Sequence, residues 1–157
     1  MREVVEQCAA LPGYEVFKYL DNGGVRDVKA RDLNLYLKRV MGEEFTPKDF
    51  RTWAGTLIAA VKLASLGPAT EPKAAERNVI EAVDAVAERL GNTRDIARAS
   101  YISPRVIDHY LEGSVVAYHA EHLDEVIAAE QGDLTDGEKA LLDLLNKELR
   151  QDLKKAA

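Results

Sequence analysis

Apolar residues recur along most of the chain at intervals of three and four, the spacing that predicts amphipathic helices. Glycine and proline interrupt this pattern and set the expected helix ends, as at Gly91 and Gly113. We expect helices around residues 4–8 and over 32–41, 47–66, 73–90, 94–100, 104–112, 115–129 and 136–154. Residues 14–20 and 25–28 flank the turn signal at 21–24 and predict two short strands. The pattern therefore predicts a mainly α fold, a compact helical domain with a small β element near its N-terminus.

The longest expected helix begins with a cap signal. Thr46 fits the N-cap, Pro47 the first helical position, and Asp49 is close to a capping-box position. The positions expected to be buried are Phe50, Trp53, Leu57, Val61 and Ala64. Arg51 is turned by about 100° from Phe50, so it falls at the edge of this apolar face or outside it. In the last helix the inward positions are Leu141, Leu144, Leu145 and Leu149.

The charge of the chain is unevenly distributed. A net charge of −6 argues, taken alone, against a nucleic-acid partner, because binding phosphates requires a local excess of Lys and Arg. Residues 114–157, however, carry ten acidic and five basic residues, so the acidity belongs mostly to the end of the chain. Arg94, Arg98 and Arg105 form a local basic patch in which only Asp95 offsets them.

The composition excludes several classes of protein. A single cysteine, Cys8, excludes an internal disulfide framework, and no set of Cys and His has the spacing of a zinc site. The least polar stretch, 53–66, contains Lys62 and is too short to span a bilayer. The first residues are charged where a signal sequence would be basic and then apolar. We expect a soluble, cytoplasmic protein with no membrane partner.

Two segments carry a more specific signal. The first is Lys48-Asp49-Phe50-Arg51-Thr52-Trp53-Ala54-Gly55-Thr56. The second is Leu90-Gly91-Asn92-Thr93, followed nine residues after Asn92 by Tyr101. In order, spacing and flanking residues these segments resemble the C-terminal part of the catalytic domain of bacterial, poxvirus-like type IB DNA topoisomerases.

The resemblance implies a reaction on double-stranded DNA that requires no cofactor, metal or ATP. In that family a tyrosine attacks a phosphodiester to form a 3′-phosphotyrosyl link, the free strand rotates, and the link is resealed. On the matching positions Tyr101 is the nucleophile, Arg51 is the second of two phosphate-binding arginines, and Asn92 stands where many relatives have histidine. We expect Lys48, Arg98 and Arg105 to contact DNA.

The chemistry of these residue types agrees with the implied roles. A phenol has a reference pKa near 10, so cations and hydrogen bonds must stabilise the charge that develops on an attacking tyrosine. A guanidinium offers a planar fork of donors to a phosphate, whereas a neutral amide can donate but cannot shuttle protons near pH 7. Nine helical residues advance about 13 Å. Asn92 and Tyr101 are therefore expected to approach one phosphate from different sides.

Other parts of the family's pattern have no counterpart here. No stretch matches the segments of the first arginine and the general-acid lysine, and the flanks of Lys18 and Lys29 do not match the lysine's motif. We expect a single domain over 1–157, divided into 1–29, 30–113 and 114–157, that is the C-terminal portion of a catalytic domain. It would be an excised piece or a truncated gene product. Such a nucleoid-associated monomer is expected to bind DNA weakly and to relax it poorly without the missing N-terminal half.

Simpler interpretations stay open. Tyr101 fits a packed helix-end tyrosine, Arg51 a surface residue paired with a nearby carboxylate, and Asn92 a turn residue that ends a helix. His119 and His122 have a helical spacing that a metal could use, but no further ligand completes a site, so a solvated pair is the simpler interpretation. At the level of function, a tyrosine recombinase fragment and a DNA-binding or interaction module without catalysis are the alternatives.

Overall fold

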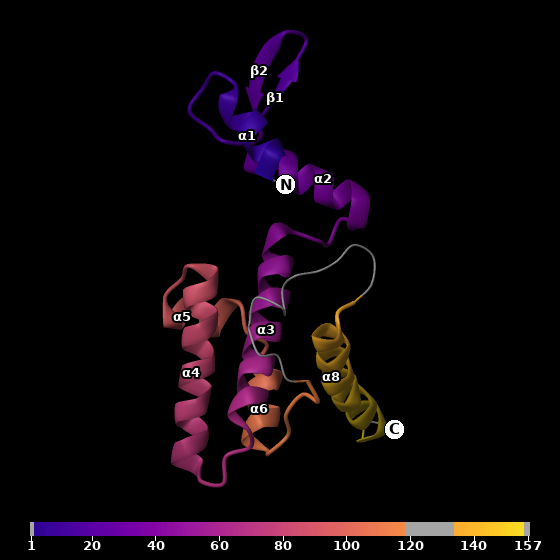
Figure 1. Cartoon of the computed structure of the whole chain (residues 1–157). Coiled ribbons are helices and arrows are strands. Elements are labelled where there is room, and N and C mark those ends of the chain that lie inside the picture. Colours follow the sequence, from indigo (N-terminus) through magenta and orange to yellow (C-terminus); the bar gives the residue numbers. More distant parts are fainter. Residues whose placement is uncertain (1, 119–133, 156–157) are drawn as a thin grey trace. The chain divides into compact units, whose positions relative to one another are not determined.

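A computed structural model describes residues 2–118 and 134–155 of the chain. The contacts within it gather into two compact units, Met1–Asp49 and Phe50–Ala157, which we describe one at a time. Helices dominate the described residues, and the two strands form one small sheet near the N-terminus. The expectation of a mainly α fold with an N-terminal β element is therefore confirmed (Figure 1).

The first unit consists of α1 (Arg2–Ala10), a hairpin of β1 (Lys18–Asp21) and β2 (Gly24–Asp27), and α2 (Ala30–Met41). The strands are antiparallel, with Lys18 opposite Asp27 and Asp21 opposite Gly24. Asn22 and Gly23 connect them at φ values of 46° and 81°, the left-handed pair that a tight hairpin turn requires. The buried ammonium group of Lys18 donates to the carbonyls of Leu11 and Gly13 at 2.7 and 3.1 Å. The hairpin is thus tied to the loop after α1.

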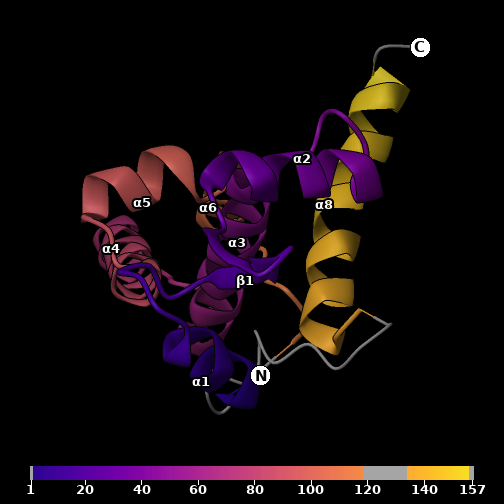
Figure 2. The same ribbon diagram turned by 90° about the horizontal axis from the view of Figure 1, so that it is seen from above.

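The second unit is helical. Its elements are most of α3 (Pro47–Leu66), then α4 (Pro72–Leu90), α5 (Arg94–Ser100), α6 (Pro104–Leu111) and α8 (Asp136–Lys155). Figures 1 and 2 both place α3 between α4 and α8. This central position explains why α3 carries nine buried residues, from Gly55 to Ala64. The apolar faces of α4, α6 and α8 complete the core through residues such as Val83, Val86, Val106 and Leu141.

The buried faces follow the expected stripes with one error. Leu57, Val61 and Ala64 of α3 are buried, and Trp53 packs at the edge of the core. Phe50, expected inside, is 49% exposed. The period of a helix predicts the direction in which a side chain points, but only the neighbouring elements decide whether anything covers it there.

The segment after α6 also differs from the expectation. A helix was predicted over 115–129, but residues 115–118 are not helical, and 119–129 lie outside the described residues. Val116 lies in the core with only 3% of its surface exposed, so its apolar character reflects burial of a connecting segment. In α8, Leu141 and Leu144 are buried as expected, while the side chain of Leu149 lies outside the described ones.

Within 2–118 and 134–155, none of the helices combines the length and apolar character needed to cross a bilayer.

Candidate active site

The turn between α4 and α5 positions Asn92. Gly91 adopts the left-handed conformation at φ 65° and ψ 42°, which residues without a Cβ adopt most easily. The backbone N–H of Asn92 donates to Ala87 O at 2.9 Å, and that of Gly91 to Glu88 O at 3.3 Å. These two bonds form the Schellman arrangement that satisfies the last carbonyls of a helix. The half-buried Asn92 therefore serves as a helix terminator, and its amide remains in a defined place.

Helix α5 starts immediately after this turn and leads to Tyr101. The hydroxyl of Thr93 accepts from the backbone N–H of Ile96 and caps the helix. Arg94 binds Asp84 of α4 through two hydrogen bonds of 2.6 and 2.7 Å. The hydrogen bonds from Arg94 hold the pKa of the Asp84 carboxyl below its ordinary value. Arg94 thus forms an ion pair between α5 and α4. Its charge in the predicted basic patch is therefore offset by Asp84.

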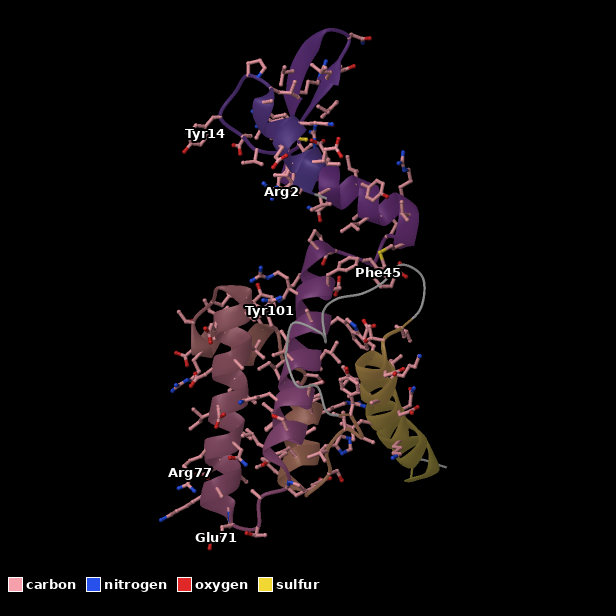
Figure 3. The ribbon with its side chains drawn as sticks, viewed as in Figure 1. Arg2, Tyr14, Phe45, Glu71, Arg77 and Tyr101 are labelled. Atoms are coloured by element: carbon pink, nitrogen blue, oxygen red, sulfur yellow. The ribbon has the colours of Figure 1, made fainter. Side chains whose placement is uncertain are left out.

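Arg51, Asn92 and Tyr101 meet at the end of α3 that faces α5. One terminal nitrogen of Arg51 (Nη2) donates to the carbonyl oxygen of Leu90 at 2.9 Å, and Asn92 Nδ2 donates to the same oxygen at 3.0 Å. The guanidinium carbon of Arg51 lies 4.8 Å from the centre of the Tyr101 ring, within the range of a cation–π contact. Figure 3 shows Tyr101 where α5 turns towards α3. The structure therefore brings together the three residues singled out in the sequence.

The charge and exposure of this cluster suit an anionic ligand. Arg51 is exposed and Tyr101 is half-buried, so both remain reachable from solvent. Two donors, one cationic and one neutral, already converge on a single oxygen atom. A guanidinium has five N–H donors and an amide has two, and the bonds to Leu90 O use one from each side chain, which leaves donors for a phosphate oxygen. The arrangement can therefore hold a phosphate beside a phenol.

The three other cations predicted to contact DNA are exposed, and one of them belongs to the first unit. Arg98, which is exposed, lines a hollow of about 320 Å³ together with Glu76, Ile107 and other residues of α4 and α6. Arg105 is exposed in the first turn of α6. Lys48 is exposed in the first turn of α3, which belongs to the first unit. Their role in DNA binding stays a prediction.

His109 is buried in α6 within the core region, and His119 and His122 lie outside the described residues. In the part of the chain that the structure describes, no group of three His, Cys, Asp or Glu side chains is placed to hold a metal ion.

Trp53, two residues after Arg51, connects α3 to the start of α8. Its indole N–H donates to Glu138 Oε1 at 2.8 Å. The other carboxylate oxygen accepts from the backbone N–H and the hydroxyl of Thr135 at 2.8 and 3.0 Å. The backbone N–H of Glu138 donates in return to the Thr135 hydroxyl oxygen at 3.3 Å, and the two residues thus form a capping box. Burial raises the pKa of Glu138, but the hydrogen bonds from Trp53 and Thr135 outweigh it and the net pKa lies below the ordinary value.

We expect Glu138→Gln to lower the free energy of unfolding at pH 7 by about 1–2 kcal/mol, because an amide cannot accept all these hydrogen bonds and carries no charge to strengthen them. Since the folded pKa is lowered, the stabilisation is fully present above the unfolded value of about 4.3 and is lost as the pH falls through the folded value. Urea unfolding of both proteins should give a difference that is constant above about pH 5.5 and shrinks below about pH 4.

The matched control for this prediction is Asp136→Asn, which removes a carboxylate from the same helical turn. Asp136 pairs only with the exposed Lys139 among the described contacts, at 3.1 Å, so we expect an effect below about 0.5 kcal/mol. Equal losses in the two variants would mean that Glu138 acts through general charge at the helix start and not through Trp53.

The sequence of this chain matches a protein-family model and is similar to that of a viral enzyme. The sequence model of the family described as "Eukaryotic DNA topoisomerase I, catalytic core" matches residues 1–118, a range that includes Arg51, Asn92 and Tyr101. DNA topoisomerase 1B of Acanthamoeba polyphaga mimivirus is 30% identical over 114 residues, covering 68% of this chain and 34% of the viral protein. The chain thus spans about a third of the length of that relative.

Proposed function

The chain belongs to the family of type IB DNA topoisomerases, and from this membership we propose that it supplies the nucleophile and two phosphate ligands of a DNA strand-cleavage reaction. The observation that carries the proposal is the convergence of Arg51, Asn92 and Tyr101, which come from α3, the α4–α5 turn and the end of α5. A phosphate bound by the first two would lie beside the Tyr101 ring.

The proposed chemistry is a transesterification. Tyr101 Oη forms a bond to phosphorus and its proton passes to solvent, while the bond from phosphorus to the 5′ oxygen breaks. The Arg51 guanidinium stabilises the charge on the non-bridging oxygens of the five-coordinate transition state, and the Asn92 amide donates to one of them. The product is a 3′-phosphotyrosyl link and a strand with a free 5′-hydroxyl, which reseals the break by the reverse attack. Relaxation of supercoils would follow from rotation between these two steps.

The three residues leave one part of this chemistry to other groups. A 5′ alkoxide is a poor leaving group unless it is protonated as it departs, and neither Asn92 nor Arg51 can donate that proton near pH 7. We infer that efficient cleavage needs a general acid and a further cation beyond this cluster. The isolated chain should then react with an activated phosphodiester much faster than with ordinary DNA.

The experiment uses a duplex oligonucleotide that ends in a 3′-(p-nitrophenyl) phosphodiester, whose leaving group departs without protonation. Attack by Tyr101 should release p-nitrophenolate and leave a covalent protein–DNA adduct on a denaturing gel. The unmodified duplex with a scissile bond near its end should give little adduct, and a supercoiled plasmid should stay supercoiled. Efficient relaxation would contradict the inferred need for other groups. Absence of adduct with the activated ester would contradict the proposed nucleophile.

The alternative interpretation is a DNA-binding module without catalysis. Measurements of DNA affinity, taken together with adduct formation, distinguish it from the proposed function. With a net charge of −6, the chain should bind a labelled duplex weakly and with strong salt dependence. Fluorescence anisotropy at low and moderate salt measures this. Binding at low salt without adduct formation would favour the module, and strand exchange between two defined sites would favour a recombinase.

A further inference from the structure

The backbone on both sides of Tyr101 is held by two threonines of α3. Helix α5 ends at Ser100, so the carbonyls of Ser100 and Tyr101 find no partner within the helix. The Thr52 hydroxyl donates to Ser100 O at 3.3 Å, and the Thr56 hydroxyl lies 3.5 Å from Tyr101 O, at the long limit of a hydrogen bond. The same Thr56 oxygen accepts from the backbone N–H of Ser103 at 3.0 Å. Thr56 is only 3% exposed, so water cannot easily replace it in these bonds.

Gly55 allows this close approach. A Cβ built at position 55 would lie 2.5 Å from the carbonyl oxygen of Tyr101 and 3.1 Å from its Cβ. The first of these distances is shorter than real Cβ contacts, and the atom it meets belongs to the backbone. Glycine is also disfavoured in the interior of a helix relative to alanine, so a glycine here has a local reason. That reason is the passage of the Tyr101 backbone across α3.

The ring of Tyr101 is placed by the same helix. Arg51 and Gly55 are four residues apart and therefore lie on one face of α3, in successive turns. One turn holds the guanidinium over the ring at 4.8 Å, and the next turn contacts the backbone of the same residue. Two flanking side chains, Ala97 and Ile102, are 0% and 5% exposed and anchor the segment in the core. The distance from Arg51 to Tyr101 thus depends on the contact at Gly55 and Thr56.

We propose that Gly55 and Thr56 are positioning residues for the Tyr101 nucleophile, an inference that rests on the function proposed above. They touch neither the phosphate nor the phenol oxygen in this role. They set the separation between the tyrosine and the arginine that binds the phosphate. An added methyl group at position 55 must move the Tyr101 backbone by roughly 1 Å to reach an ordinary van der Waals separation.

The kinetic test compares adduct formation by the wild-type chain and Gly55→Ala with the p-nitrophenyl oligonucleotide. A displacement of about 1 Å is expected to lower the rate at saturating DNA by roughly 100-fold. The DNA concentration at half-maximal rate should stay within about twofold, because the phosphate ligands themselves are unchanged. A loss of affinity with an unchanged saturating rate would overturn the positioning role.

The second test needs no catalysis. The Nε–H resonance of Arg51 in a ¹H–¹⁵N spectrum of the full chain reports the ring current of Tyr101, and Tyr101→Leu gives its value without the ring. Gly55→Ala should move the resonance towards the Tyr101→Leu position. If the resonance stays at its wild-type position in Gly55→Ala, the positioning role is contradicted, whether or not the chain forms an adduct. The positioning role and the proposed cleavage function can therefore fail separately.

Thr56 provides a matched pair of variants. Thr56→Val keeps the shape of the side chain and removes the hydroxyl, so the saturating rate should fall and the Arg51 resonance should shift in the same direction as in Gly55→Ala. Thr56→Ser keeps the hydroxyl and should restore both readouts to wild-type values. A Thr56→Val chain with the wild-type saturating rate and an unmoved Arg51 resonance would show that the hydroxyl has no positioning role. Because Thr56→Val keeps the number of non-hydrogen atoms, it also serves if Gly55→Ala fails to fold.

Discussion

Tyr101→Phe is expected to abolish covalent capture of the activated oligonucleotide, a loss on the order of 10⁴-fold or more, since no other group takes over a missing nucleophile. The substitution removes one oxygen atom and keeps the ring that lies under the Arg51 guanidinium at 4.8 Å. Non-covalent DNA affinity and the melting temperature should therefore stay close to those of the wild-type chain. Adduct gels, anisotropy and thermal unfolding measure the three quantities.

The chain offers a matched control in Tyr36 of α2. Arg39 lies over the Tyr36 ring at 5.7 Å, and Tyr36 is 54% exposed, so it is a second accessible tyrosine beside an arginine. It has no neighbour equivalent to Asn92 among the described contacts. Tyr36→Phe should form adduct at the wild-type rate. An adduct that persists in Tyr101→Phe and disappears in Tyr36→Phe would reassign the nucleophile to the first unit.

Arg51→Ala is expected to lower the rate of adduct formation at saturating DNA by about 10²–10³-fold, the usual loss when one transition-state donor is removed. Arg51→Lys should recover only part of this rate, because an ammonium group is a point charge and lacks the planar fork that meets two phosphate oxygens. Arg51→Ala also removes the hydrogen bond to Leu90 O and the contact with the Tyr101 ring, so it should lower the free energy of unfolding by about 1–2 kcal/mol and leave the chain folded.

Binding data distinguish a transition-state role for Arg51 from ordinary attraction to DNA. If Arg51 contacts one phosphate, Arg51→Ala should also reduce the slope of log affinity against log salt by about one. Arg39→Ala removes the matched arginine of α2 and should leave the saturating rate unchanged. A saturating rate that survives in Arg51→Ala, with only affinity lost, would mean that Arg51 binds the ground state and the transition state equally.

Much of the local structure could be predicted from residue types alone. Gly91 ends α4, and Asn22-Gly23 forms the hairpin turn, both as expected. These features depend on hydrogen bonds between residues a few positions apart, so a short stretch of sequence contains the relevant information. The period of α3 likewise predicted burial of Leu57, Val61 and Ala64, which is confirmed, although the structure also buries the residues between them, such as Ile58 and Leu63.

The errors arise where distant segments decide the outcome. Phe50 follows the apolar period of α3 and yet is 49% exposed, because coverage depends on elements from other parts of the chain. Residues 115–118 were predicted to be helical from their apolar character, which instead reflects burial of Val116 in a connecting segment. Gly55 and Thr56 belong to the segment 48–56 that carries the family resemblance. Their contacts could not be predicted from it, because they involve Tyr101, which is 45 residues from Thr56. The signal available in the sequence was Gly55 itself, because glycine is disfavoured in the interior of a helix and its presence there indicates a close contact.

Residue types were sufficient to predict most helix ends, the residues that carry the family resemblance and the chemistry available to each side chain, because propensity, capping and functional groups are properties of short segments. The tertiary structure decided that the Arg51 guanidinium reaches Leu90 O, 39 residues away, beside the Asn92 amide and the Tyr101 ring. It did so through the packing of α3 against the end of α5, where a missing side chain at Gly55 and the Thr56 hydroxyl allow close contact. Such convergence depends on the shapes of two packed helices, and no local pattern contains it.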